Sequence, residues 1–220
     1  TRIDIAVLTH SHPDHIQGFL HLTEYFPVTQ LWFHGDDTHP MVKAIINNVK
    51  AKGGVVKSVK ELPDLIRFGG LKIQPLHPRP RGGREKTYGE LNENENSVVL
   101  HLEFKKRTAL FTGDIEAITE EEWGIYWPEA ELIKVPHHGS ETSSTSAFLK
   151  AINPQIGILS SGEGNPFGLP HPLVVQRYQD QGIELLLTAC SGTIVMRTSG
   201  KRWDVKAADP GGECEPLRSG

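Results

Sequence analysis

The chain has 220 residues, of which 37% are hydrophobic, and its formal net charge is −4. A chain of this length can bury a substantial core, and none of its apolar segments approaches the roughly 20 residues that a membrane-spanning helix needs. The acidic balance argues against a large electrostatic footprint for duplex DNA. The composition therefore predicts a soluble globular domain that does not itself span a membrane.

A cluster of potential metal ligands follows the first apolar run, residues 3–8, which reads as a strand. The cluster has the pattern H-x-H-x-D-H and consists of His10, His12, Asp14 and His15. Imidazole nitrogens and a carboxylate oxygen are the mixture that Zn²⁺ or a similar ion accepts. Histidines of no special role rarely have this spacing. We therefore interpret the cluster as a two-metal site, in which His10 and His12 bind one ion and the two later residues turn toward a second.

Strand-like and helix-like runs alternate along the chain, which favours layered α/β packing. Apolar residues at helical spacing predict helices over residues 14–25, 40–52, 118–123, 144–152 and 172–181. Runs rich in β-branched residues predict strands over residues 28–33, 55–59, 71–76, 97–104, 107–111, 132–135, 156–160, 184–188 and 193–197.

The sequence predicts a single domain over residues 1–207, and no internal repeat interrupts it. Residues 208–220 contain several glycines and prolines and are expected to form a disordered tail. The two cysteines, Cys190 and Cys214, settle little about the redox compartment. Cys190 is expected to be a small residue in a hairpin turn.

A further candidate ligand follows the strand predicted over residues 107–111. Gly113 allows a tight turn, so that Asp114 can project into a site at the strand end. A carboxylate there can bridge two cations and offset their repulsion. Alternatively, Asp114 caps the helix that follows. The histidine cluster favours the metal role.

The strand predicted over residues 132–135 ends in a Pro-His-His-Gly turn, so one of His137 and His138 should bind a metal ion. The hydroxyl-bearing residues that follow are Ser140, Thr142, Ser143 and Ser144. With the amides of a helix N-terminus they can bind a phosphate. The last two can instead simply cap the helix.

A loop rich in glycine and proline follows the strand predicted over residues 156–160. It contains Asn165 and His171 in the segment N-P-F-G-L-P-H-P. Its rigidity indicates that it positions something. His171 either bonds a backbone carbonyl or serves the site directly.

Together these motifs resemble the metallo-β-lactamase superfamily, whose signature is the H-x-H-x-D-H motif after a strand. Four further segments resemble the soluble domain of ComEC-type DNA-internalisation proteins and occur in that family's order. They are NENSVVL (94–100), ALFTGDIE (109–116), LIKVPHHGS (132–140) and the loop over residues 165–172. The resemblance covers residues 3–196, and the pairing of FTGDIE with VPHHGS is more specific than the first motif alone.

The resemblance implies a four-layer αββα sandwich, whose N-terminal strands this chain lacks. It also implies a metal-dependent phosphodiesterase, a nuclease related to DNA uptake in competence, in which a metal-activated hydroxide attacks a DNA phosphodiester. Two divalent ions, Zn²⁺ or Mn²⁺, are the expected cofactors, and single-stranded DNA is the expected substrate. In ComEC-type proteins this domain lies on the outer face of the cytoplasmic membrane, periplasmic or extracellular. The chain would meet the membrane only through a missing part of a longer protein, and no protein partner can be inferred.

The resemblance assigns roles to individual residues. The implied metal ligands are His10, His12, Asp14, His15, Asp114 and His138. His138 is preferred to His137 because the superfamily's terminal ligand is a His directly before Gly. The implied catalytic residues are Asp14, which orients the hydroxide, Asp114, and His171, which binds a phosphate oxygen or protonates the leaving group without binding metal. The implied substrate contacts are His137, Ser140, Thr142 and Asn165.

One metal site lacks a ligand that many superfamily members have. Where they carry a further histidine, residues 91–96 contain none, so Asn96 is left as a weak oxygen ligand or a neighbour of the ligands. The site made by His10, His12 and a shared Asp114 should therefore bind its ion more weakly, and Mn²⁺ should compete better with Zn²⁺. Two other function classes remain: a small-molecule metallo-hydrolase resembling a phosphorylcholine esterase or a lactonase, and a non-catalytic metal-bound interaction domain.

Overall fold

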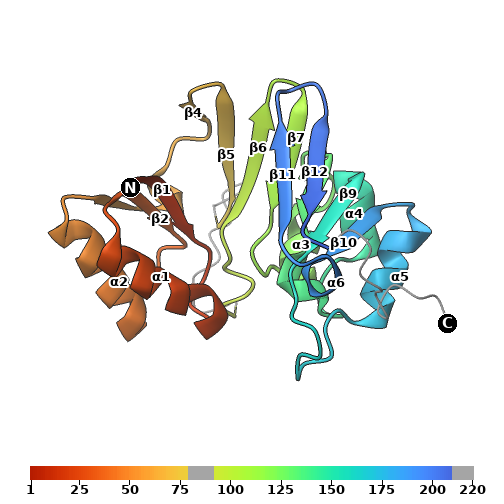
Figure 1. The fold of residues 1–220 in the computed structure, drawn as a ribbon, viewed down its shortest axis with the longest axis horizontal. Coiled ribbons are helices and arrows are strands. Elements are labelled where there is room, and N and C mark those ends of the chain that lie inside the picture. Colours follow the sequence, from red (N-terminus) through yellow and green to blue (C-terminus); the bar gives the residue numbers. More distant parts are fainter. Residues whose placement is uncertain (79–91, 210–220) are drawn as a thin grey trace. The chain divides into compact units, whose positions relative to one another are not determined.

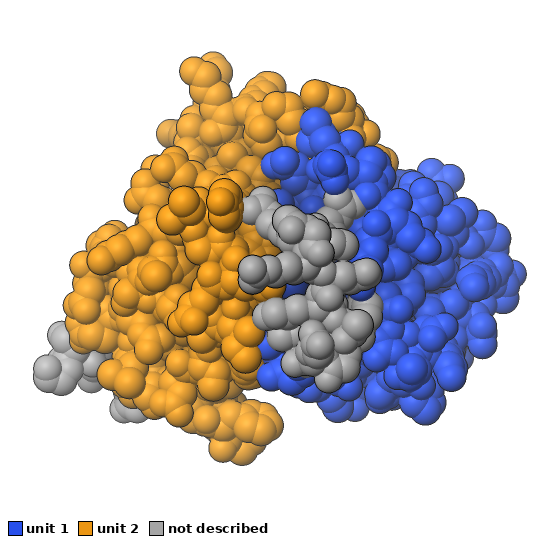
Figure 2. Space-filling model, turned by 180° about the vertical axis from the view of Figure 1, so that it is seen from behind, with its two compact units in different colours: residues 1–66, 74–100 blue, residues 67–73, 101–220 orange. Residues whose placement is uncertain are grey.

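The structure is a computed structural model that describes residues 1–78 and 92–209. The chain divides into two compact units, coloured separately in Figure 2. Unit 1 comprises residues 1–66 and 74–100, and unit 2 comprises residues 67–73 and those from 101 onward. Most of the predicted tail, residues 210–220, lies outside the described residues. Among the helices that the structure describes, none combines the length and the apolar character needed to cross a bilayer.

Unit 1 is built on a parallel three-stranded sheet whose strands are connected by two helices (Figure 1). Each helix begins with a proline, which has no N–H to leave unsatisfied at that position. The apolar residues of the second helix recur at helical spacing and are buried against the sheet. The elements are β1 (Ile3–Leu8), α1 (Pro13–Tyr25), β2 (Val28–Phe33), α2 (Pro40–Ala51), β3 (Val55–Ser58) and the 3₁₀ turn η1 (Val59–Glu61).

The register of unit 1 brings two loops to one edge of its sheet. Leu8, the last residue of β1, pairs with Phe33, the last residue of β2. The H-x-H-x-D-H segment and His34 therefore leave the sheet side by side. His34 Nε2 lies 3.2 Å from the hydroxyl of Ser11, and both side chains are buried. Burial lowers the pKa of His34 to about 4, so its imidazole is neutral at pH 7.

A larger sheet of seven strands has the order β10-β9-β8-β7-β6-β5-β4. Strands β7 to β10 are parallel, and a separate antiparallel hairpin is formed by β11 and β12. The strands are β4 (Ile66–Phe68), β5 (Leu71–His77), β6 (Val99–Phe104), β7 (Arg107–Phe111), β8 (Leu132–Lys134), β9 (Ile156–Leu159), β10 (Glu184–Leu187), β11 (Ile194–Thr198) and β12 (Trp203–Ala207). The helical elements are α3 (Ala117–Trp123), η2 (Gly124–Tyr126), η3 (Pro136–Gly139), α4 (Ser146–Ile152), α5 (Pro172–Asp180) and α6 (Thr188–Ser191).

The predicted elements agree with these bounds to within two residues, apart from a few departures. Strands β4 and β12 were not predicted from the sequence. Cys190 lies in the short helix α6 and is disulfide-bonded, so its interpretation as a simple turn residue is wrong. The helix predicted to begin at residue 144 begins at Ser146, and Thr145 caps it by accepting from the N–H of Phe148. The proposed caps Ser143 and Ser144 are therefore wrong.

Helix α4 begins two residues later than predicted because of Glu120, a buried residue of α3. One carboxylate oxygen accepts from the N–H of Ser144 at 2.6 Å and the other from the N–H of Thr145 at 2.7 Å. Ser144 also has a left-handed φ of 56°, which interrupts a helix. A buried carboxylate thus satisfies the amides of the turn before α4 and ties that turn to α3.

Replacing Glu120 by Ala should lower the free energy of unfolding by about 3 kcal/mol, because one buried and one half-buried amide lose charge-assisted hydrogen bonds. The neighbouring Glu121 is exposed, and Glu121→Ala should change stability by less than about 0.5 kcal/mol. Urea unfolding of the two variants measures the difference. Equal stabilities would contradict the structural role of Glu120.

Stability should also depend on the protonation of His34. Its pKa is about 4 in the folded chain against 6.5 when unperturbed, so between these values the unfolded chain binds a proton that the folded chain does not. The free energy of unfolding should therefore fall by up to about 3 kcal/mol as the pH drops through this range. His34→Gln should lack this part of the pH dependence, while exposed His21→Gln should retain it. If the free energy of unfolding depends on pH equally in His34→Gln and in the parent, the lowered pKa of His34 is contradicted.

Candidate metal centre

The predicted metal ligands fall into two groups, one in each compact unit. In unit 1, the H-x-H-x-D-H segment connects β1 to α1, as the sequence indicates. The ring of His10 lies 4.1 Å from that of His15 and 4.8 Å from that of His12, measured between ring centroids. Asp14 is in the first turn of α1, and its Oδ2 lies 3.4 Å from His15 Nε2. All four predicted ligands of this segment are therefore neighbours.

Hydroxyl groups hold the buried member of this group in position. His10 is fully buried, and its Nδ1 lies 3.1 Å from the hydroxyl of Thr9 and 3.2 Å from that of Ser97. The N–H of Val98 donates to the carbonyl of Thr9, which ties the Asn-rich turn to the end of β1. Partners that fix one ring nitrogen of a histidine orient the other toward a ligand site.

The Asn-rich turn contributes a carboxylate rather than an imidazole beside His12. Glu93 Oε2 lies 3.5 Å from His12 Nε2, with both side chains partly exposed. Asn96, the predicted weak ligand, is buried and donates from Nδ2 to the carbonyl of Asn92. Glu93 was not predicted from the sequence, although it lies in the segment where the expected histidine is missing.

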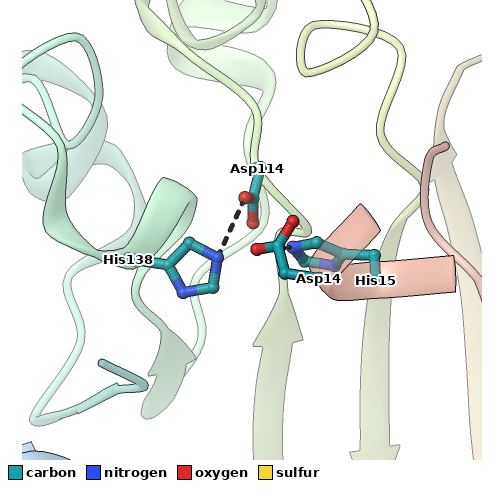
Figure 3. A group of neighbouring side chains, drawn as sticks. All are labelled: Asp14, His15, Asp114 and His138. Atoms are coloured by element: carbon teal, nitrogen blue, oxygen red, sulfur yellow. Dashed lines mark ion pairs between the residues drawn. The ribbon is translucent and has the colours of Figure 1, made fainter. Parts of the chain in front are cut away.

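In unit 2, Asp114 follows β7 and is only 2% exposed. Gly113 turns the chain with a left-handed φ of 56°, which a glycine adopts without steric cost. Asp114 Oδ2 lies 3.2 Å from Nε2 of His138, the ion pair drawn in Figure 3. The helix cap that was the alternative role of Asp114 is wrong, since α3 has Glu116 at its N-cap position.

The Pro-His-His-Gly turn after β8 is strained. His137 and His138 have φ values of 44° and 52°, in the left-handed region that side chains rarely adopt, and Gly139 continues at 79°. A Cβ atom at Gly139 would lie 2.8 Å from Pro170 and 2.9 Å from Leu159. Left-handed non-glycine residues cost on the order of 1–3 kcal/mol each and cluster at functional sites. The strained backbone of this turn thus points His137 toward Glu116 and His138 toward Asp114.

The hydrogen bonds of His138 fit a metal ligand. Its Nδ1 donates to the carbonyl of Ser160 at 2.8 Å, which leaves Nε2 as the acceptor nitrogen of the neutral ring. That nitrogen faces a carboxylate oxygen, so a proton or a cation must lie between two acceptors. Hydrogen bonding to Asp114 accordingly raises the pKa of His138 above its usual value. A divalent cation satisfies both atoms equally well, and the carbonyl partner is typical of zinc-binding histidines.

The second histidine belongs to a separate polar network. His137 Nδ1 lies 2.9 Å from Glu116 Oε1, and the hydroxyl of Thr142 donates to the same oxygen at 2.8 Å. The hydroxyl of Ser140 lies 3.0 Å from that of Thr142. Two predicted substrate contacts, His137 and Thr142, therefore meet the carboxylate of Glu116, and the third, Ser140, joins them through the hydroxyl of Thr142. Glu116 was not identified from the sequence. The three contacts do not stand at the N-terminus of α4, which begins further along the chain.

His171 and Asn165 lie in the loop before α5. The N–H of His171 donates to the carbonyl of Gly139 at 2.9 Å, so this loop is bonded to the His138 turn. The ring of His171 caps α5 through Nδ1 and lies 3.4 Å from Glu141 Oε2 through Nε2. The side chain of Asn165 bonds to backbone atoms of its own loop, at Gly162, Phe167 and Leu169.

Comparisons with known proteins identify the family to which the chain belongs. The family model described as the metallo-beta-lactamase superfamily matches residues 1–163. The chain is 29% identical over 199 residues to ComE operon protein 3 of Bacillus subtilis, covering 89% of this chain and 25% of that protein. It is 35% identical over 131 residues to competence protein ComA of Neisseria gonorrhoeae, covering 58% of this chain and 18% of that one. The chain thus spans about a quarter or less of these relatives.

The fold is similar to that of a solved metallo-hydrolase. Igni18 from Ignicoccus hospitalis superposes with a TM-score of 0.52 at 13% identity, covering 92% of this chain and 79% of that one. A likeness at this identity shows the fold alone, and it confirms the predicted fold class. With the family match over most of its length, the chain belongs to the metallo-β-lactamase superfamily and is similar to ComEC-type competence proteins.

Proposed function

We propose that this chain is a metal-dependent phosphodiesterase that hydrolyses single-stranded DNA. The observation that carries the proposal is the facing pair of acceptors, Asp114 Oδ2 and His138 Nε2, whose orientation the carbonyl of Ser160 fixes. A structural salt bridge would not need two left-handed residues to aim the imidazole. The similarity to competence proteins supports DNA as the substrate.

The proposed ligands of the tighter ion are Asp14, His15, Asp114 and His138, side chains of the kinds that hold such an ion. His10 and His12 would hold a second ion with a share of Asp114, and Asn96, which precedes the Ser97 that contacts His10, would be an outer neighbour. A divalent cation supplies positive charge to a phosphate and lowers the pKa of a water molecule toward neutrality. Zn²⁺ and Mn²⁺ both accept this ligand set.

The remaining predicted residues would handle the substrate and the protons. Asp14, in the first turn of α1, would orient the attacking water. His171, whose loop is bonded to the His138 turn, would protonate the leaving oxygen. Glu116 holds His137 and accepts the hydroxyl hydrogen of Thr142, so Thr142 would position the network while His137 and Ser140 would donate hydrogen bonds to phosphate oxygens. Asn165 would act by shaping the loop that carries His171.

The proposed location is the outer face of a cytoplasmic membrane, to which a longer protein would attach the domain. The similarity to ComEC-type proteins motivates this location. The disulfide at Cys190 is consistent with it, because such bonds persist in oxidising compartments.

The two proposed ions should differ in affinity, since one has four side-chain ligands and the other has fewer. Stepwise dialysis against a chelator, followed by elemental analysis, should remove the ion of His10 and His12 first. His138→Ala should lose the tighter ion, whereas His21→Ala, at an exposed position of α1, should keep both. Two ions that leave together from the parent chain would contradict the unequal ligand sets.

Cleavage of labelled single-stranded DNA tests the proposed activity. Asp114→Ala and His138→Ala should abolish cleavage without unfolding the chain. His171→Ala should slow it roughly 10²- to 10⁴-fold, the usual effect of losing a general acid, with the metal content unchanged. If the Asp114→Ala protein is folded, is assayed at the same metal concentration as the parent and still cleaves DNA, the mechanism is refuted. Hydrolysis of phosphorylcholine esters or lactones without DNA cleavage would show that the chain is a small-molecule metallo-hydrolase. Bound metal without any hydrolysis would show that it is a non-catalytic interaction domain.

A further inference from the structure

Lys134 is a charged residue beside the centre that no motif analysis assigned. It is the last residue of β8, and it pairs in register with Phe111 at the end of the parallel strand β7. Its ammonium donates to the carbonyl of Gly113 at 2.9 Å and to Asp114 Oδ1 at 3.0 Å. The register thus sets a lysine against the turn that presents Asp114.

The two oxygens of Asp114 consequently have different partners. Oδ1 accepts from Lys134, and Oδ2 faces His138. A carboxylate that bridges two ions through both oxygens needs Oδ1 as well as Oδ2. In this structure an internal cation already occupies the Oδ1 side.

Packing limits where the ammonium can go. The stem of Lys134 lines an apolar cavity of about 560 Å³ within unit 2, next to Phe111, Leu132 and Met196. An ammonium turned toward that apolar lining would give up its hydrogen bonds to the carbonyl of Gly113 and to Asp114. The carboxylate it meets is 2% exposed and itself needs a neighbouring cation. The contact therefore benefits both groups and should persist when the centre is loaded.

We propose that Lys134 is a positioning residue that competes with the second metal ion for Asp114. By holding Oδ1, it leaves Asp114 to serve the ion of His138 through Oδ2, and its positive charge opposes a second cation nearby. This inference rests on the proposed metal-dependent function. The charge of Lys134 would then be a second reason, besides the missing histidine, for the lower affinity proposed for the second ion.

Titration with Mn²⁺ tests the proposal without any activity measurement. The electron paramagnetic resonance signal of the free ion reports how much Mn²⁺ is unbound at each step. Lys134→Met removes the charge and frees Oδ1, so the second ion should bind on the order of tenfold more tightly. Lys134→Arg keeps the charge and the donors and should restore the parent behaviour. Lys106→Met, at an exposed position in the turn between β6 and β7, is the matched control and should bind like the parent.

Circular dichroism and melting in chelator establish that each variant is folded. If Lys134→Met does not fold, Lys134→Gln, whose uncharged side chain is shorter, takes its place with the same expectation. A second ion bound no more tightly by the folded variant would overturn the role of Lys134 while leaving the proposed metal centre intact. A parent chain that binds no Mn²⁺ or Zn²⁺ would overturn both.

Discussion

The burial of one carboxylate, Asp114, governs the chemistry of unit 2. An ionised group that is 2% exposed has lost nearly all its hydration, and in a low-dielectric environment it requires compensating positive charge. Lys134 supplies that charge at one oxygen, and a proton or a cation beside His138 supplies it at the other. The fold therefore requires positive charge, from a proton or a cation, at both oxygens of Asp114.

Parallel strands make this arrangement possible. Strands β7, β8 and β9 are neighbours and run in the same direction, so the segments that follow them leave the same edge of the sheet. The first segment carries Asp114, the second His138, and the third the Ser160 carbonyl that orients His138. Unit 1 has the same arrangement, with the H-x-H-x-D-H segment after β1 and His34 after β2. Sites at the carboxyl ends of parallel strands are the general rule for such sheets.

The sequence could predict what depends on local pattern. The ligand motif after β1 and the turns that carry Asp114 and His138 each combine an apolar strand, a turn residue and a ligand type within a few positions. It could not predict what depends on register. Nothing near Lys134 in the chain shows that β8 pairs with β7 so as to aim its ammonium at Asp114. Glu116 likewise becomes significant only when Thr142 and His137 are folded back onto it, across an intervening helix and strand.

The segment from Leu132 to Ser140 shows how these constraints meet in nine residues. Its strand must be apolar to lie inside a parallel sheet, yet its last residue must be a lysine long enough to reach the turn after the neighbouring strand β7. Directly afterwards, two left-handed histidines must point to different carboxylates, His137 to Glu116 and His138 to Asp114. An ordinary helical or extended continuation would turn these rings another way. The strained turn therefore separates two adjacent imidazoles: one joins the network of hydroxyl groups around Glu116, and the other meets the buried carboxylate of Asp114.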